Sequence, residues 1–278
     1  MTDPPMLAHQ NTPAPPAGVF YVGAKAASWL PRARTPLLLS RPALAGRVRR
    51  LPRAAVPWLL DSGAFTELGE NGAWTVPAEQ YAAEAARWAA EAGNLAAAGI
   101  QDWLTTPGVL DATGRTVADH QARTVASLLE LRALAPELPW LPTLQGWELG
   151  DYLAHVALYA DAGVDLTAEP LVGVGSIATR QHTDTVGELM AELHDAGLRL
   201  HAFGAKVTGL ARWGTELSSA DSMAWSLDAR RMDYRCGRHR GDCRNCQWWA
   251  EAWGERMAAM TGGSHSRQLT LGDAMPMD

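Results

Sequence analysis

The chain has 278 residues, is 47% hydrophobic and carries a formal net charge of −6. Its length and apolar content support a sizeable folded core, but no apolar run approaches the roughly 20 residues that span a bilayer, which argues against a membrane-embedded protein. The first residues lack the charged start and apolar stretch of a secretory signal, so a cytoplasmic location is expected. The negative charge argues mildly against a nucleic-acid partner, because phosphate binding usually needs a basic surface.

The two ends of the chain differ from its middle. Residues 1–18 are rich in proline, and residues 262–278 are rich in small and polar residues. Both segments are therefore predicted to be flexible and to carry no chemistry. Between them we expect a large domain over residues 19–231, followed by a cysteine-bearing segment with a closing helix over residues 232–261.

Short apolar runs alternate with helical patterns in the middle of the chain. Eight runs are predicted to be strands: Val19–Gly23, Pro36–Ser40, Pro57–Gly63, Ile100–Thr106, Trp140–Gly146, Pro170–Ser176, Leu198–Gly204 and Leu217–Met223. Apolar residues at three- and four-residue spacing predict four helices: Pro77–Ala98, Thr116–Leu134, Leu149–Ala162 and Thr179–Ala196.

This alternation predicts an α/β fold with a parallel sheet, because strands that alternate with helices need crossover connections. Eight such units are the number that closes a (β/α)₈ barrel. The first two crossovers are too short for full helices, which leaves an open doubly wound sheet as the second possibility.

In a barrel of this kind, the residues that do chemistry lie at the carboxyl ends of the strands. Four of the predicted strands carry polar or glycine positions there: Asp61 with Ser62, Gln145 with Gly146, Gly173 with Gly175, and Asp221. The sequence therefore predicts that these residues meet on one rim of the barrel.

Asp61 and Asp221 are the candidates for chemistry on that rim. Two carboxylates can divide the work of breaking a glycosidic bond with retention, one attacking and the other moving a proton. The structural alternatives are that Asp61 caps a turn and that Asp221 caps the following helix. Spacing alone does not choose between these roles.

Gln145 and the glycine-rich run after the sixth predicted strand are candidates for binding a flat ligand. The amide of Gln145 is both donor and acceptor, and Gly146 beside it lets a planar group approach the backbone. The run from Gly173 to Ser176 lacks the spacing of a dinucleotide fingerprint and the lysine of a Walker loop. It is better interpreted as a backbone edge for a heterocycle.

All three cysteines of the chain lie within eleven positions, in the order Cys236, His239, Cys243, Cys246. Zinc bound by three thiolates and one imidazole is the commonest structural use of such a set, and four protein ligands leave no open position for catalysis. The sequence predicts a structural zinc site. His265 is a substitute ligand farther along the chain, and a loop of reduced cysteines without metal is the alternative.

Five motifs in order carry a resemblance to a known family: DSGAF (Asp61–Phe65), LQGWELGDY (Leu144–Tyr152), LVGVGSI (Leu171–Ile177), LHAFGAK (Leu200–Lys206) and SADSMAW (Ser219–Trp225). This set, followed by a cysteine-rich zinc site, resembles tRNA-guanine transglycosylase-type barrels over roughly residues 19–253. The short chain, the segment QDWLTTP (101–107) and the compact zinc ligands are most similar to the DNA 7-deazaguanine transglycosylases, the DpdA family.

The resemblance implies that guanine in DNA is exchanged for a free 7-deazaguanine base such as 7-cyano-7-deazaguanine. It implies that Asp221 is the nucleophile and that Asp61 protonates the departing base. The residues implied to line the base pocket are Ser62, Gly63, Gln145, Gly146, Gly173, Val174 and Gly175, and Asp102 is the carboxylate available to read the base. The arginine-rich stretch Arg230–Arg244 is expected to face phosphates.

Three other functions remain open at this point. The same exchange could act on tRNA, although the chain lacks an added RNA-binding domain. A barrel without catalysis could bind nucleic acid through its zinc segment and arginines. A small-molecule nucleosidase with a structural zinc would show no salt-dependent affinity for DNA. A helper ATPase and the oligomeric state are also undetermined by the sequence.

Overall fold

The structure is a computed structural model and describes residues 18–261. The predicted flexible segments therefore lie outside the described residues, apart from Gly18, and so does His265. Among the described residues, no helix combines the length and the apolar character needed to cross a membrane.

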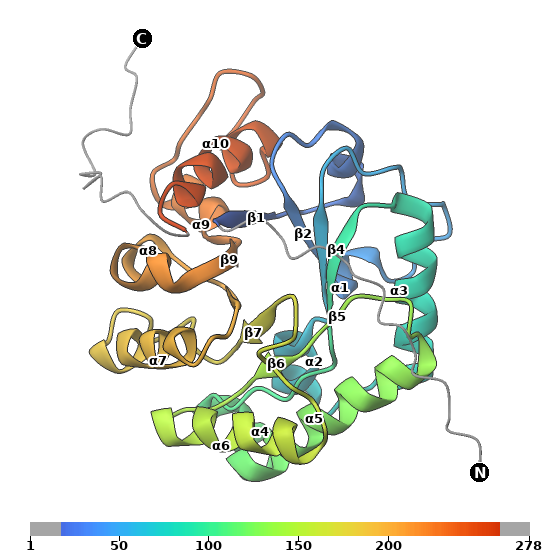
Figure 1. Cartoon of the computed structure of the whole chain (residues 1–278). Coiled ribbons are helices and arrows are strands. Elements are labelled where there is room, and N and C mark those ends of the chain that lie inside the picture. Colours follow the sequence, from blue (N-terminus) through green and yellow to red (C-terminus); the bar gives the residue numbers. More distant parts are fainter. Residues whose placement is uncertain (1–17, 262–278) are drawn as a thin grey trace.

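Nine parallel strands form a single sheet (Figure 1): β1 (Val19–Gly23), β2 (Leu37–Ser40), β3 (Trp58–Asp61), β4 (Leu95–Gly99), β5 (Trp140–Leu141), β6 (Thr143–Leu144), β7 (Val172–Val174), β8 (Leu200–Ala202) and β9 (Leu217–Ser222). Their order across the sheet is β5-β4-β3-β2-β1-β9-β8-β7-β6. The first and last strands of this order, β5 and β6, are consecutive in the chain. The sheet therefore curls into a nearly closed barrel.

The barrel closes at a strand that is split by a proline. Pro142 alone separates β5 from β6, and proline has no N–H to donate to a neighbouring strand. The first half pairs with β4 and the second half pairs with β7. Both halves belong to the single predicted strand Trp140–Gly146, so the prediction of a (β/α)₈ barrel is confirmed and the open sheet is excluded.

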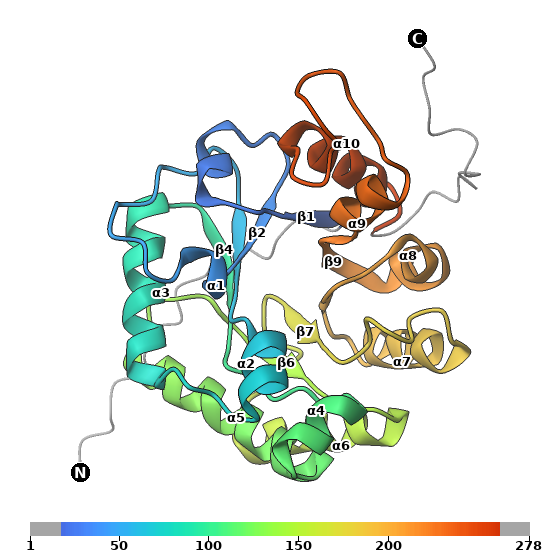
Figure 2. The same cartoon turned by 180° about the vertical axis from the view of Figure 1, so that it is seen from behind.

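Helices surround the strands in both views (Figures 1 and 2). The α-helices are α1 (Arg41–Leu44), α2 (Ala64–Asn71), α3 (Ala78–Ala92), α4 (Pro107–Thr113), α5 (Val117–Leu134), α6 (Leu149–Asp161), α7 (Asp184–Asp195), α8 (Val207–Trp213), α9 (Ala224–Arg231) and α10 (Gln247–Ala258), with short 3-10 helices at Ala27–Arg32 and Gly214–Glu216. All four predicted helices are present, within a few residues of their expected bounds at most ends.

The fourth strand is where the prediction was wrong. The helix α3 ends at Ala92 because Gly93 adopts a left-handed φ of 66°, which breaks the helical path. The residues Leu95–Ala98, predicted as the end of that helix, belong to β4 instead, which runs to Gly99. The predicted strand Ile100–Thr106 is an extended loop beyond the carboxyl end of β4.

The last helix takes the place that the short first crossovers leave uncovered. The ring of Trp253 on α10 packs edge-on against Phe20 of β1, with ring centroids 5.7 Å apart. A Cβ on Gly254 would come within 2.2 Å of the Val22 side chain, so glycine permits the close approach of helix and strand. The segment after β9 therefore completes the outer layer of the barrel at β1.

Candidate active site and metal centre

The inward-facing side chains of the barrel change from apolar to polar along the strands. Alternate residues of a strand point to the same side, and one inner layer is apolar: Tyr21, Leu38, Leu59, Ala97, Leu141 and Leu171. Two positions further along β3, the next inward residue is Asp61. The barrel thus has an apolar floor and a polar mouth at the carboxyl ends of its strands.

Asp61 is the last residue of β3 and is half-buried. Burial, together with the negative charges of Asp221 and Asp102, raises the pKa of Asp61 to about 7, although a hydrogen bond from the backbone N–H of Gly63 lowers it. This contact two residues along the chain is the turn cap that the sequence analysis gave as the alternative role of Asp61, while Gly63 takes the N-cap position of α2. The carboxyl group of Asp61 can therefore hold or release a proton near neutral pH.

Asp221 lies on β9 with only 6% of its surface exposed. The backbone N–H of Gly204 donates to its Oδ1 over 3.1 Å. Nε2 of His201 lies 3.3 Å from the same oxygen, but it is not aligned for a hydrogen bond. Asp221 does not cap the following helix, because α9 begins after Met223 without a side-chain cap. Its carboxylate is held at the mouth and interacts electrostatically with Asp61.

His201 is a residue of this site that the sequence analysis did not single out. It is fully buried on β8, and its Nδ1 lies 2.8 Å from the hydroxyl oxygen of Ser219. Its ring packs edge-on against Phe203, with centroids 4.6 Å apart. The alternation of inward positions along the predicted strand Leu198–Gly204 was the signal that could have found it.

Asp102 reaches the mouth from the loop after β4. Its Oδ2 accepts a hydrogen bond of 2.5 Å from Nε2 of Gln145, and its Oδ1 accepts one of 3.4 Å from the hydroxyl of Ser62. Burial raises the pKa of Asp102 to about 6, although both of these hydrogen bonds lower it. Because β4 ends at Gly99, Asp102 lies beyond the strand and not deep inside the barrel.

Both the backbone and the side-chain amide of Gln145 are hydrogen-bonded. Its backbone N–H donates to Nδ1 of His155 over 2.9 Å, and its carbonyl accepts from Nε2 of Gln121 over 2.8 Å. Its side-chain Oε1 accepts from the hydroxyl of Ser176 over 2.6 Å. The structure thus brings Asp61, Ser62, Gln145 and Asp221 of the strand-end pattern to one end of the barrel, and Asp102 joins them from the loop after β4.

The glycines beside this cluster make room for protein side chains. A Cβ on Gly175 would lie 2.2 Å from Nε2 of Gln145, and one on Gly146 would lie 2.7 Å from the ring of Tyr152. A Cβ on Gly173 would lie 2.7 Å from the ring of Phe203.

The backbone of the run Gly173–Gly175 is hydrogen-bonded within the barrel. The N–H groups of Gly173 and Gly175 donate to the carbonyls of Pro142 and Leu144, while the carbonyl of Val174 accepts from the N–H of Phe203. The hydroxyl of Tyr152 donates to the carbonyl of Gly175. These N–H and C=O groups are occupied by internal hydrogen bonds, so they are not free to pair with a heterocycle as the sequence analysis expected.

The predicted metal ligands come together after α9. The ligand atoms of Cys236, His239, Cys243 and Cys246 all lie within 4.8 Å of one another, a set that could hold a metal ion. Nδ1 of His239 lies 3.1 Å from the carbonyl of Arg240, which leaves Nε2 facing the sulfur of Cys243 at 3.6 Å. Such a contact fixes the ring of a metal-binding histidine and its protonated nitrogen. The donors fit a tetrahedral Cys₃His site.

Residues 232–261, called the metal segment below, are held against the barrel by aromatic residues. Cys246 precedes the first residue of α10, and Trp249 one turn later donates its indole N–H to the carbonyl of Trp225. The indole N–H of Trp225 in turn donates to the carbonyl of Gly23 at the end of β1. Cys246 is thereby joined to the mouth of the barrel through a short path of packed residues.

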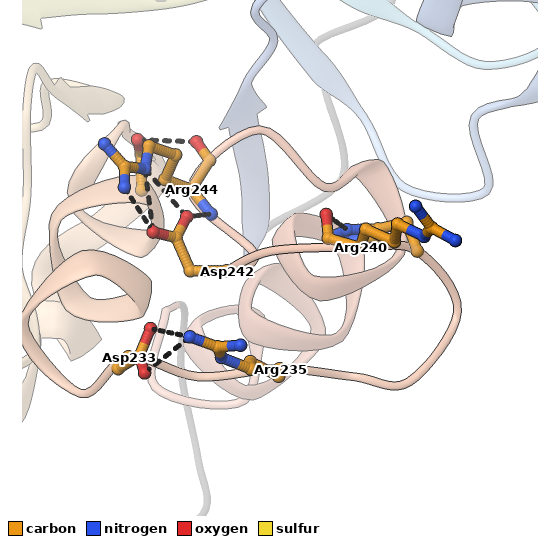
Figure 3. A network of polar contacts seen from close by, with 7 residues as sticks. Asp233, Arg235, Arg240, Asp242 and Arg244 are labelled. Atoms are coloured by element: carbon orange, nitrogen blue, oxygen red, sulfur yellow. Dashed lines mark hydrogen bonds and ion pairs between the residues drawn. The ribbon is translucent and has the colours of Figure 1, made fainter.

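Two arginines of this segment are paired with neighbouring aspartates (Figure 3). Arg235 contacts both carboxylate oxygens of Asp233, and Arg244 contacts both oxygens of Asp242. Hydrogen bonds from Arg244 lower the pKa of Asp242 to about 2. The predicted basic stretch is therefore partly neutralised by its own carboxylates.

The chain matches the family DpdA, described as DeoxyPurine in DNA protein A, over residues 17–274. The chain belongs to the DpdA family. Membership of the DpdA family implies a role in deoxypurine modification of DNA, DNA as the substrate and a transglycosylase-like enzyme. A search of curated proteins finds no match.

Proposed function

We propose that this DpdA-family chain exchanges guanine in DNA for a free 7-deazaguanine base, such as 7-cyano-7-deazaguanine, through a covalent aspartyl-glycosyl intermediate. The observation that carries the proposal is the cluster of three buried or half-buried carboxylates, Asp61, Asp102 and Asp221, at the carboxyl ends of barrel strands. Retention at a glycosidic carbon needs one carboxylate that attacks and another that changes between acid and base.

Asp221 is the proposed nucleophile. Its carboxylate attacks the anomeric carbon of the target deoxynucleotide, and the bond from that carbon to N9 of guanine breaks with its electrons passing to the base. The N–H of Gly204 orients the carboxylate, because it holds Oδ1 at 3.1 Å. The incoming base later displaces Asp221 from the same carbon, which restores the free carboxylate.

Asp61 is the proposed acid and base. In its protonated form it gives its proton to the departing guanine, and as the carboxylate it then takes the N9 proton of the incoming base. A pKa of about 7 suits both steps, because a catalytic acid–base group works best when its pKa is near the working pH.

Asp102, Gln145 and Ser62 are proposed to read the base. A carboxylate accepts hydrogen bonds from ring N–H groups, and an amide N–H donates to a carbonyl oxygen. Asp102 and Gln145 already share a hydrogen bond, so the two side chains present a fixed set of donors and acceptors. Gly63, Gly146 and the run Gly173–Gly175 are proposed to shape the wall of this pocket.

The DNA must deliver its base out of the stack, because the anomeric carbon and N9 are not accessible inside a duplex. A hollow of about 250 Å³ lies between α8 and α9 and is lined in part by Lys206 and Arg231. Lys206 lies between β8 and α8, Arg231 is the last residue of α9, and Asp228 also lines the hollow. We propose that these cations hold phosphates next to the extruded nucleotide, together with other arginines of the stretch Arg230–Arg244.

Zinc is the proposed metal of the Cys₃His cluster. Cys236, His239, Cys243 and Cys246 would hold it as four protein ligands, which makes the site structural. When bound, the metal supplies a cross-link that fixes the loop between α9 and α10. The reaction at the mouth is carried by side chains of the barrel.

The test is to incubate the purified chain with DNA carrying labelled guanine, and separately with labelled tRNA, in the presence of 7-cyano-7-deazaguanine. We expect label release from DNA with the wild type, none with Asp221→Asn, and wild-type release with Asp233→Asn as the matched control. Release of label from tRNA and not from DNA would show that tRNA, and not DNA, is the substrate. No release from either, with bound metal and a normal unfolding transition, would contradict the proposed reaction.

A further inference from the structure

Ser176 occupies a strained position at the edge of the candidate pocket. It follows β7 and has a left-handed φ of 58°, although it is not a glycine. A left-handed backbone costs a non-glycine residue roughly 1 kcal/mol, and such strain persists where the surrounding structure holds the residue in place. Ser176 is 7% exposed.

The hydroxyl of Ser176 joins two parts of the barrel mouth. It accepts a hydrogen bond of 2.9 Å from the backbone N–H of Thr105, in the loop that also carries Asp102. It donates its single proton to Oε1 of Gln145 over 2.6 Å. A backbone N–H is always a donor, so the hydroxyl that accepts from it has its proton available for Gln145. This contact identifies the oxygen end of the Gln145 amide.

The other end of the amide is identified independently. Nε2 of Gln145 donates to Oδ2 of Asp102, and an ionised carboxylate can only accept. Both contacts therefore require the same orientation of the amide. The backbone of Gln145 is held separately by His155 and Gln121, so the side-chain torsions are what Ser176 fixes.

We propose that Ser176 is a positioning residue that sets the orientation of the Gln145 amide and thereby the hydrogen-bonding pattern that a base meets. The inference rests on the proposed function of Gln145 and Asp102. In this orientation Gln145 keeps a second N–H for a carbonyl oxygen of the ligand, and Asp102 keeps acceptor capacity for its ring N–H groups. Without the hydroxyl, the oxygen end of the amide loses its partner and Asp102 alone orients the side chain, so the amide is held less firmly.

The test uses Ser176→Gly in the metal-loaded full chain. Glycine relieves the left-handed strain, but it also removes two buried hydrogen bonds and leaves the Thr105 N–H unpaired, so we expect a Tm lowered by a few degrees. The expected kinetic effect is a three- to tenfold higher KM for 7-cyano-7-deazaguanine with kcat changed less than about twofold, which is the order of one hydrogen bond. Asn94→Gly is the matched control, because Asn94 has a similar φ of 55° away from the mouth.

A double-mutant cycle with Gln145→Ala separates positioning from a general structural effect. If Ser176 acts through Gln145, then Ser176→Gly adds no further increase in KM in the Gln145→Ala background. Equal effects in both backgrounds, or an unchanged KM in the single variant, would overturn the inference. Calorimetric binding of the free base is measured beside the kinetics. A wild type that releases no guanine defeats the proposed reaction, whereas one that binds the base equally with and without the hydroxyl defeats this inference.

Discussion

Carboxylates at the barrel mouth and carboxylates of the metal segment are placed in opposite electrostatic environments. Asp61 and Asp102 are buried near other negative charges, and the pKa of each is raised, to about 7 and about 6. Asp242 in the metal segment lies beside the guanidinium of Arg244, whose hydrogen bonds lower the pKa of Asp242 to about 2. Asp61 and Asp102 can therefore exchange protons closer to neutral pH, whereas Asp242 is kept ionised beside Arg244.

The difference indicates where the chain maintains an unfavourable arrangement. Burying a carboxylate next to like charges costs free energy, which a stable fold ordinarily avoids. The mouth retains this arrangement, while the metal segment neutralises its charges locally. Perturbed carboxylates gathered at strand ends are typical of catalytic sites, and this supports the proposed reaction at the mouth.

The largest effect on activity is expected for Asp61→Asn, which removes one of the acids at the mouth. We expect guanine release to fall by about 10²- to 10⁴-fold, because the acid–base group is lost. In the wild type, the protonated fraction of Asp61 is high below its pKa and falls above it, so release should decline as pH rises through about 7. A wild-type pH profile that is flat between 6 and 8 would contradict the assignment.

Asp61→Asn should lower activity but raise stability at pH 8. A carboxyl group whose pKa is raised in the folded state makes the protein less stable as pH rises from about 4 to about 7, because the folded state then binds more protons than the unfolded state. Asp61→Asn removes this penalty, so its Tm at pH 8 should exceed that of the wild type by about 2–4 °C. Thermal unfolding at pH 8 and pH 4 measures the effect, which should vanish at the lower pH.

A second prediction concerns the metal segment as a structural unit. Cys246→Ser should remove a ligand next to the start of α10 and lower the Tm by about 10 °C, since the loss of a structural metal costs several kcal/mol. Metal content by atomic spectroscopy and Tm by calorimetry are the measurements. Cys246→Ser that keeps both its metal and its Tm would show that another residue completes the site. Asn245→Ser, at an exposed neighbour, is the control.

The smallest effect is expected at the paired acids of the metal segment. Asp242→Asn should leave guanine release within twofold and the Tm within about 2 °C, because its ion pair joins residues two apart in the chain and the Arg244 side chain is half-exposed. It also releases the charge of Arg244, so the dependence of DNA affinity on salt should steepen by about one unit in log–log slope. An unchanged slope would place Arg244 away from the phosphates.

Most of the barrel follows from its sequence pattern, and β4 shows where the pattern fails. The run Leu95–Gly99 is rich in alanine, the residue with the highest helix propensity, and it continues the period of α3. It forms a strand because its small side chains fit on both faces: Ala97 packs in the barrel interior and Ala98 packs in the cluster outside the sheet. That requirement comes from its neighbours in space, which one chain segment cannot reveal.

The candidate site was predictable to the extent that strand ends carry distinctive residues. Asp61, Gln145 and Asp221 stand out as polar residues after apolar runs. Ser176 and His201 do not, because a serine or a histidine gains meaning only from its partner across the barrel. Similarly, Asp233 and Asp242 are visible in the arginine-rich stretch, but their pairing with Arg235 and Arg244 is known only from the structure.

The packing of α10 on β1 has a consequence for synthesis of the chain on the ribosome. Phe20 and Val22 emerge early, and their outer faces are covered by Trp253 and Gly254, which are made long afterwards. A nascent chain that has not yet reached α10 therefore carries an uncovered apolar strand at its first barrel position, the kind of surface that chaperones bind. The segment that carries the Cys₃His cluster and α10 is thus the last described part of the barrel to be synthesised.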